Sequence, residues 1–344
     1  MVEGIKTYSL EALSKLFGDA RIPSFRTMQI ASWLYNKGVT SYSEMSNIPK
    51  VLREQLELSY PLCTPELVDE QTSKDGTTKF LLKFQDGALV ETVGLPSPDG
   101  RLSVCCSSQA GCAMACSFCA TGKGGLTRSL APGEIIDQIN VVRRCYGTSP
   151  TNIVVMGQGE PFANYDNVLA ALRIANHPKL LGIGARHITV SSCGIIKGIN
   201  RFATEPEQFT LAVSLHSAIP ETRNQLMPAV KGYPLGDLRK ALIDYSSKTG
   251  RRFSFEYALM KDVNDSNNHL QELIKYCRGL LCHVNLIPLN EIEESPFKPA
   301  SKKQITKWCD SLNNAGIPST IRASRGADIS GACGQLANKQ LLQK

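Results

Sequence analysis

The hydrophobic positions of the chain follow a helical spacing at the start and a strand spacing later. Residues 9–17 and 25–38 place apolar side chains three and four positions apart, and a short helix is predicted to begin at residue 47. Residues 77–95 alternate between apolar and polar side chains instead, as a β-hairpin does, and Asp86-Gly87 provides its turn. The spacing therefore changes from helix to strand before residue 100.

A cluster of Pro, Gly and Asp at residues 96–100 follows the hairpin and interrupts regular structure. We place a domain boundary between about residue 85 and residue 100. The expected division is an N-terminal helical accessory domain with a hairpin extension, residues 1–90, and a larger second domain, residues 91–344.

Strand and helix patterns alternate throughout the second domain. Strands are expected at 102–108, 152–157, 187–192, 209–216, 252–260, 283–289 and 319–324. Helices are expected at 130–147, 164–177, 194–203, 235–250, 267–280 and 301–316. Repeated strand–helix units form a parallel sheet with helices outside it. Six or seven units are too few for a closed eight-stranded barrel, so the pattern predicts an α/β fold with an open, partial barrel. Its chemistry is expected at the carboxyl ends of the strands.

Composition and charge narrow the class of protein. The net charge is +7, but residues 1–90 are nearly neutral, so the excess of Lys and Arg lies in the second domain and includes the basic segment 295–344. Such a surface favours a polyanionic partner, although an ordinary basic bias would give the same count. No apolar run is long enough to span a membrane. Twelve cysteines in a long chain without an export signal indicate a reducing cytoplasm.

Three of these cysteines lie in one short stretch directly after the first strand of the second domain. Cys112, Cys116 and Cys119 have the spacing C-x3-C-x2-C within GCAMACSFCATGKGG, residues 111–125. A closed zinc site takes four ligands and a redox CxxC motif takes two. Three thiolates would leave one iron of a four-iron cluster open to another ligand. The alternatives are three buried free cysteines, or a zinc site completed by a distant residue.

The triplet resembles the signature of the radical S-adenosylmethionine superfamily. Further stretches, spread from about residue 20 to residue 337, resemble the RlmN/Cfr family of RNA adenine methyltransferases, and the RlmN members more than Cfr. They are FRTMQIASWLYNKGVTSYSEM, VETVGLP, CSFCATGKGGLTR, GEPFANYDNV, HVNLIP and RGADISGACGQL. The resemblance implies a partial (β/α)6 radical SAM barrel and an RNA-binding accessory domain.

The resemblance also assigns roles to individual residues. It makes Cys112, Cys116 and Cys119 the ligands of one [4Fe-4S] cluster. The positions that match contacts to S-adenosylmethionine are Gly159, Glu160, Ser191, Ser214, Leu215, His216 and Asn290. Gln158, beside this set, stands where many members have Met.

Three residues match the catalytic positions of the family. Cys333 matches the cysteine that carries the methyl group, and Glu91 matches a proposed general base. Cys105 matches the cysteine that resolves the protein–RNA bond, although the adjacent Cys106 leaves that assignment open by one position. The remaining cysteines, Cys63, Cys145, Cys193, Cys277, Cys282 and Cys309, are assigned no chemistry.

The activity implied by the resemblance is methylation of carbon 2 of adenine. Family members act on an adenine of 23S ribosomal RNA, and some act on the transfer-RNA adenine next to the anticodon. One S-adenosylmethionine methylates Cys333, and a second supplies the radical that activates this methyl group, so two are used per turnover. Attack of Cys105 on Cys333 then releases the RNA and leaves a disulfide. A one-electron reductant such as flavodoxin or ferredoxin is implied, and a monomer is expected.

Three other functions compete with this one. Cfr-like methylation would place the methyl group on carbon 8 of adenine. A non-catalytic RNA-binding protein would use the cysteines for a structural metal. A radical enzyme acting on a small metabolite would not need Cys333.

Overall fold

The computed structural model describes residues 4–292 and 295–337, and the residues beyond them, which include part of the basic C-terminal segment, lie outside this description. Its strands are β1 Glu66–Thr72, β2 Thr78–Lys83, β3 Leu89–Pro96, β4 Leu102–Cys105, β5 Gln109–Gly111, β6 Leu126–Ser129, β7 Asn152–Val155, β8 Ile188–Ser192, β9 Thr210–Ser214, β10 Phe253–Leu259, β11 Cys282–Pro288 and β12 Ser319–Ile321. Its α-helices are α1 Leu10–Asp19, α2 Ser24–Ala31, α3 Lys50–Ser59, α4 Ala120–Lys123, α5 Pro132–Tyr146, α6 Tyr165–Asn176, α7 Ile196–Phe202, α8 Pro220–Leu226, α9 Leu235–Thr249, α10 Asn267–Cys277 and α11 Lys302–Asn314. Shorter helical segments are η1 Ile5–Thr7, η2 Ser32–Lys37, η3 Tyr42–Glu44, η4 Pro161–Asn164, η5 Ala185–His187, η6 Pro228–Gly232 and η7 Ala327–Ile329.

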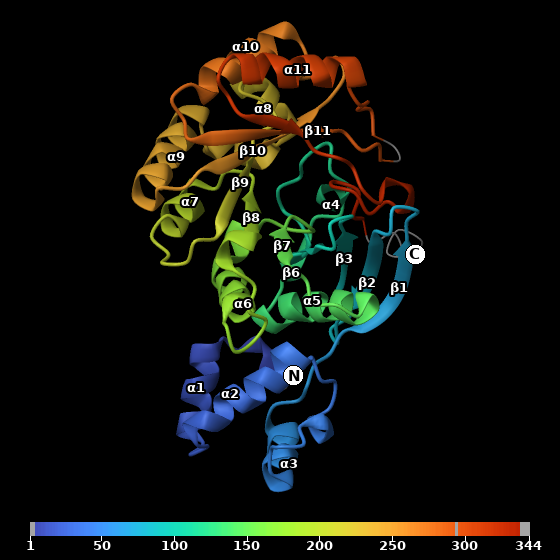
Figure 1. Cartoon of the computed structure of the whole chain (residues 1–344), viewed down its shortest axis with the longest axis vertical. Helices are drawn as coiled ribbons and strands as arrows, with labels where there is room; N and C mark the ends of the chain where they lie inside the picture. Colours follow the sequence, from blue (N-terminus) through green and yellow to red (C-terminus); the bar gives the residue numbers. More distant parts are fainter. Residues whose placement is uncertain (1–3, 293–294, 338–344) are drawn as a thin grey trace.

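One ten-stranded sheet forms the centre of the molecule (Figure 1). Its strand order is β1-β2-β3-β4-β7-β8-β9-β10-β11-β12. The strands from β4 to β12 in this order are parallel, and β1 to β4 pair antiparallel. The expected α/β fold with a partial barrel is therefore confirmed, as is the expected hairpin, which is β2 and β3.

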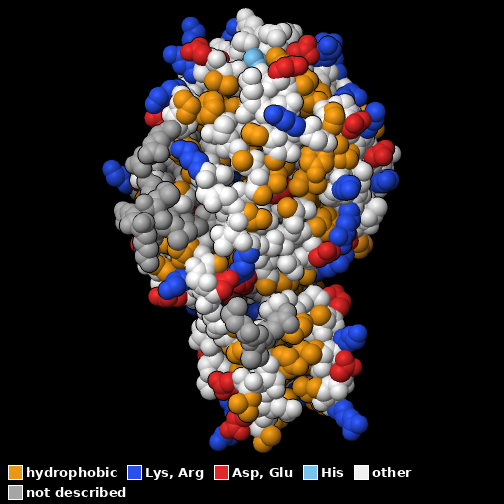
Figure 2. Space-filling model, turned by 180° about the vertical axis from the view of Figure 1, so that it is seen from behind, with side chains coloured by type: hydrophobic (Ala, Val, Ile, Leu, Met, Phe, Trp, Pro, Cys, Tyr) orange, Lys and Arg blue, Asp and Glu red, His pale blue; other side chains and the backbone are white. Residues whose placement is uncertain are grey.

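The N-terminal helices form a small bundle below the barrel (Figure 1). Seen from behind, this bundle exposes several hydrophobic side chains (Figure 2). The boundary expected between residues 90 and 91 stays a prediction, because β3 runs across it within the continuous sheet. No helix in the described part of the chain is both long and apolar enough to cross a membrane.

Several elements were not expected from the hydrophobic pattern. β1 forms the edge of the sheet and is solvent-exposed over most of its length. Its sequence therefore lacks the alternating apolar positions that would predict a strand. Charged residues on such an edge protect it from pairing with another chain. β5 and β6 are three and four residues long, and α8 begins at Pro220, where the sequence PETRNQL shows no apolar stripe.

A close contact joins the bundle to α5. Gly133 lies in the first turn of α5, and a Cβ atom there would come within 2.2 Å of the Cβ atom of Lys6. The Nζ atom of Lys6 then donates to the carboxylate of Asp137 at 2.6 Å, and both side chains are buried. Glycine at position 133 therefore allows η1 to approach α5 closely enough for a buried ion pair.

Asp137→Ala is expected to reduce the free energy of unfolding by about 3–5 kcal/mol, because it leaves the buried Lys6 cation without its partner. Urea unfolding followed by the fluorescence of Trp33, which lies in the bundle, would measure this. The control is Glu54→Ala, which breaks the exposed Lys50–Glu54 pair and should cost less than about 0.5 kcal/mol. Equal losses in the two variants would contradict a structural role for the buried pair.

Candidate active site

The cysteine triplet lies on a loop enclosed by a two-stranded sheet. β5 and β6 pair antiparallel on either side of the loop, and the backbone N–H of Cys112 donates to the carbonyl of Gly125 at 2.7 Å. Further along, the N–H of Ser117 donates to the carbonyl of Leu226 at 2.9 Å, which fixes the loop to α8. The loop is thus held at its base and at its middle.

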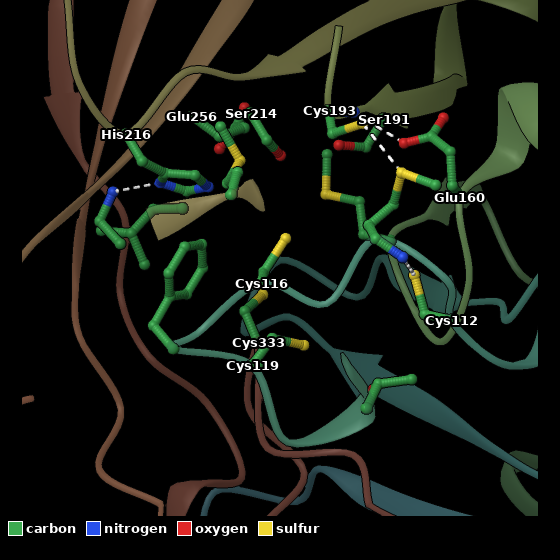
Figure 3. A pocket seen from close by; sticks show the side chains of 18 of the residues that line it. Cys112, Cys116, Cys119, Glu160, Ser191, Cys193, Ser214, His216, Glu256 and Cys333 are labelled. Atoms are coloured by element: carbon green, nitrogen blue, oxygen red, sulfur yellow. Dashed lines mark hydrogen bonds between the residues drawn. The ribbon is translucent and has the colours of Figure 1, made fainter. Parts of the chain in front are cut away.

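A cavity at the carboxyl ends of the parallel strands collects most of the expected site residues. Those that line it are Cys112, Cys116, Cys119, Gly159, Glu160, Ser191, Ser214, His216, Asn290 and Cys333. Figure 3 shows Cys333 in the same region of the cavity as Cys116 and Cys119, with Glu160 and His216 on opposite sides of the view. Leu215 is fully buried and is not part of this lining, although its backbone N–H donates to the carbonyl of Glu256.

The three thiols suit an iron–sulfur cluster. Burial raises the pKa of Cys112 to about 11 and raises the pKa of Cys116 further, and the charge of Cys119 contributes to both shifts. Bonding to a metal removes the proton of such a thiol. Within residues 4–292 and 295–337, no three His, Cys, Asp or Glu side chains converge closely enough to hold a single metal ion. The three thiols that line the cavity are of the ligand type that iron–sulfur clusters require.

The turn after β7 presents a carboxylate to the cavity. Gly159 has φ +98°, and a Cβ atom there would lie 2.6 Å from the side chain of Gln109, so only glycine fits. The next residue, Glu160, accepts the backbone N–H groups of Phe162 at 2.9 Å and Cys193 at 2.7 Å. Burial raises the pKa of Glu160, while these two bonds favour its charged form. A fixed carboxylate beside an open cavity suits an ammonium group.

Gln158, which departs from the family pattern, is buried directly before this turn. Its backbone carbonyl accepts the N–H groups of Ser108 and Gln109, and its side-chain oxygen accepts the N–H of Glu91 at 3.3 Å. The amide therefore links the turn to β3 through a polar contact.

His216 is a neutral hydrogen-bond donor at the cavity. The backbone N–H of Ala258 donates to its Nδ1 atom at 3.0 Å, so the proton of the neutral ring is on Nε2. Burial, and secondarily the charge of Arg223, lowers the pKa of His216 to about 3. The residue also has φ +55°, which is uncommon for a side chain other than glycine.

Acidification is expected to destabilise the protein through His216. The unfolded chain protonates this residue near pH 6.5, while the folded protein does not until about pH 3. Between these values the unfolded state binds one more proton, so stability falls by about 1.4 kcal/mol per pH unit as the pH decreases. His216→Gln should lack this slope, and the exposed control His187→Gln should keep it, in urea unfolding at pH 7, 6 and 5. Parallel slopes for all three proteins would refute the assignment.

The segment that carries Cys333 is fastened to the cysteine loop and to the barrel rim. Ala120 N–H donates to the carbonyl of Gly334 at 2.8 Å, and the Thr121 hydroxyl donates to the carbonyl of Leu336 at 2.7 Å. Asn290, after β11, donates from Nδ2 to the carbonyl of Cys333 at 3.2 Å. These bonds use only the backbone of the segment, which leaves the exposed thiol of Cys333 at the cavity.

A second cavity lies beside the first and brings Cys105 to Cys333. Both cysteines line it, together with Arg322. Burial raises the pKa of Cys105 to about 12, and the nearby Cys333 adds to the shift. Cys106 is instead buried within the main hydrophobic core, because successive side chains along a strand point in opposite directions. The expected disulfide is absent, since Cys105 and Cys333 are both free.

Glu91 contacts the same segment from β3. Its carboxylate pairs with Lys79 at 3.2 Å and accepts the backbone N–H of Ala337 at 2.7 Å. It is buried, and it is not among the described residues that line the two cavities.

Sequence reasoning missed three residues of the site. Cys193 lines the first cavity and contacts the sulfur of Met114 at 3.5 Å, although no role was expected for it. Glu256 is a buried carboxylate and the one charged residue of strand β10, and that isolated charge was the available signal. Arg322 follows β12 and lies 3.6 Å from Glu256, which no sequence spacing indicates.

The chain matches known proteins along nearly its whole length. Residues 106–277 match the radical SAM superfamily, and residues 5–60 match the ribosomal RNA large subunit methyltransferase N-terminal domain. The "probable dual-specificity RNA methyltransferase RlmN" of Geobacillus kaustophilus is 48% identical over 92% of this chain and 87% of its own length. A protein with the same description from Clostridium botulinum is 44% identical over 97% of this chain and 96% of its own length. The crystal structure of a radical SAM methyltransferase from Sphaerobacter thermophilus superimposes with a TM-score of 0.92, at 43% identity, over 97% of this chain and 99% of that one.

The partial barrel and its cysteine-lined cavity thus define a radical SAM enzyme, a class that uses S-adenosylmethionine and a [4Fe-4S] cluster. Within that class, the chain belongs to the RlmN family of RNA methyltransferases. It is therefore an enzyme that acts on RNA, and a non-catalytic RNA-binding role is excluded.

Proposed function

We propose that this enzyme methylates carbon 2 of an adenine in 23S ribosomal RNA, and of the transfer-RNA adenine next to the anticodon, with Cys333 as the methyl carrier. One observation carries the proposal: Cys333 lies in the wall that the two cavities share. On one side it adjoins the three cysteines of the loop, and on the other it adjoins Cys105. The Cys333 sulfur could therefore receive the methyl group in the first cavity and be released from the product through the second.

The first cavity would hold the cofactors. Cys112, Cys116 and Cys119 would bind one [4Fe-4S] cluster, and Gly159 with Glu160 would bind the ammonium group of S-adenosylmethionine. Ser191, Ser214, His216 and Asn290 would complete that site, and Leu215 would support it from beneath. When bound, two molecules of S-adenosylmethionine per turnover supply the methyl group and, with the cluster, the radical that activates it.

Cys105 would release the product. Its thiolate attacks the Cys333 sulfur, a bond between the two sulfurs forms, and the bond from the Cys333 sulfur to the transferred carbon breaks. The electron pair of that bond leaves with the carbon and the adenine ring, and the carbon takes up a proton to become the methyl group. Arg322 lines the second cavity with both cysteines, and its guanidinium favours the thiolate form of Cys105. External thiols would then reduce the pair for the next turnover.

Glu91 is proposed as the group that receives the adenine proton. Glu91→Gln keeps the size of the side chain and its bond to the Ala337 N–H, but it removes the base. If Glu91 is the base, RNA methylation per folded molecule should fall by about 10²–10⁴-fold. The variant should also be less stable, because the buried Lys79 cation loses its partner, so rates are compared at a temperature where both proteins are folded. A variant that methylates RNA at the wild-type rate would assign the residue to holding the Cys333 segment instead.

The test of the function is an anaerobic reaction of the reconstituted enzyme with two RNA fragments, one from 23S ribosomal RNA and one anticodon stem-loop. Digestion to nucleosides followed by chromatography and mass spectrometry locates the methyl group. We expect 2-methyladenosine from both fragments. Recovery of 8-methyladenosine would overturn the regiochemistry, and reaction of only one fragment would overturn the dual specificity.

Three further properties belong to the proposal. The enzyme acts in the cytoplasm as a monomer and receives electrons from flavodoxin or ferredoxin. Light scattering of the purified protein would measure the oligomeric state, and a dimer mass would reject this part.

A further inference from the structure

A third cavity opens at the opposite end of the barrel, among the amino ends of the strands. Its lining comes from the starts of β8, β9, β10 and β11 and from the segments that precede them. Five arginines line it, namely Arg101, Arg186, Arg251, Arg252 and Arg322. Of the described residues in its lining, Glu256 is the one with a carboxylate, and its side chain is buried. We call this cavity the basic mouth.

Three of these arginines keep their charge uncompensated. Within the described chain, Arg186, Arg251 and Arg252 take part in no ion pair, whereas Arg101 pairs with Asp99 at 2.7 Å. Arg186 donates to the amide oxygen of Gln208 at 2.9 Å. Arg251 donates to the carbonyl of Phe209 and to the Thr210 hydroxyl. Neutral partners thus hold the guanidinium groups of Arg186 and Arg251 in place without neutralising them, which creates a fixed positive potential.

The positive charges also lie close enough to affect one another. Burial lowers the pKa of Arg251, and the charge of Arg186 contributes in the same direction. Burial and the charge of Arg252 likewise lower the pKa of His283. Placing like charges together destabilises the free protein, and an anion bound between them would relieve that repulsion.

A column of hydrogen-bonded side chains leads from the basic mouth into the barrel. His283 bonds to Thr320 at 2.9 Å, Thr320 donates to Asn285 at 3.0 Å, and Asn285 donates to Glu256 at 2.8 Å. The Nδ1 atom of His283 is buried and has no hydrogen-bond partner. Arg322 stands at the upper end of this column and lines all three cavities, so the mouth adjoins the space around Cys333.

We propose that the basic mouth binds phosphates of the RNA backbone, so that the target strand lies along the amino ends of the barrel strands and its adenine is inserted toward Cys333. This inference rests on the proposed function and adds the face on which the RNA docks. A single strand with unstacked bases suits such a site, because guanidinium groups hold its phosphates while one base enters the barrel.

The position of the mouth argues against an acidic electron-transfer protein as its partner. The cysteine loop lies at the carboxyl ends of the strands, and the barrel strands of five to seven residues span roughly 17–23 Å. A reductant has to dock near the cluster that it reduces, whereas RNA phosphates can bind at some distance from the reacting base.

The test compares two double charge reversals of equal net charge in the reconstituted holoenzyme. Arg186→Glu with Arg252→Glu alters the mouth, and Lys302→Glu with Lys303→Glu alters exposed residues of α11 outside it. The probe is a fluorescein-labelled anticodon stem-loop, and fluorescence anisotropy gives its Kd at several salt concentrations. We expect the mouth variant to bind at least about tenfold more weakly than the α11 variant at 0.1 M salt. The slope of log Kd against log salt should fall by about 0.7 for each phosphate that the mouth variant no longer binds.

Equal Kd values and salt slopes in the two variants would overturn the proposal. It would also be overturned if the mouth variant binds RNA normally but is slow only with flavodoxin and not with dithionite, because the mouth would then serve the reductant. Arg252→Gln, which removes one charge without reversing it, replaces the double variant if that does not fold, and should lower the slope by about 0.7. If the wild-type enzyme yields no 2-methyladenosine while the binding difference persists, the proposed function fails and the RNA-binding mouth stands.

Discussion

Cys333→Ala is expected to reduce methyl transfer to RNA by roughly 10³-fold or more, because alanine has no sulfur to carry the methyl group. The hydrogen bonds at this position use its backbone, through Asn290 and the neighbouring Gly334, so the segment should keep its place. The measurement is transfer of a labelled methyl group from S-adenosylmethionine to the RNA fragment in single-turnover reactions.

The matched control for Cys333→Ala is Cys145→Ala, which removes an exposed cysteine of α5 that lines neither site cavity. It should methylate RNA at the wild-type rate. A Cys333→Ala enzyme that retains a tenth of wild-type methylation would exclude a covalent carrier at this position.

Cys105→Ala is expected to stop the reaction one step later and to accumulate protein covalently bound to RNA. Without the Cys105 thiolate nothing attacks the Cys333 sulfur, so the bond from that sulfur to the RNA carbon persists. The adduct is detected as a protein band of raised mass that survives denaturing electrophoresis and disappears after ribonuclease treatment.

Cys106→Ala provides the control for Cys105→Ala. The two cysteines are adjacent in the chain, but Cys105 lines the second cavity and the side chain of Cys106 lies in the main core. Cys106 is fully buried in the main core, so its replacement should lower stability by about 1 kcal/mol and trap no RNA. An adduct in Cys106→Ala, or free methylated RNA in normal yield from Cys105→Ala, would reassign the resolving role.

The alternation of strands and helices was sufficient to predict the partial barrel, because parallel strands buried on both faces leave strong apolar runs. The edge strand β1 could not be predicted in this way, since it buries little on either face. The strands β5 and β6 could not be predicted for a different reason: at three and four residues they are too short to show an alternating pattern.

Candidate site residues that lie in local sequence motifs could be predicted. Residues of the same cavity that belong to no motif were missed. Cys112 and Glu160 lie in recognisable sequence patterns, and the structure places both at one cavity. Arg322 and Glu256 meet only because β10 and the end of β12 come together in space, and no pattern along the chain encodes that contact. The sequence likewise could not show that Cys105 lines the second cavity while Cys106 lies in the main core, because this depends on the direction of each side chain.

The different exposure of two sulfurs has a consequence for chemoselectivity. Cys333 is exposed at the cavity that would hold the electrophilic methyl donor in the proposed reaction, whereas Cys105 is buried and lines the second cavity with a pKa of about 12. At neutral pH almost all of the Cys105 thiol is un-ionised, and un-ionised thiols are poor nucleophiles. If Cys105 is the resolving cysteine, its burial and its low ionisation would protect it from alkylation by the methyl donor.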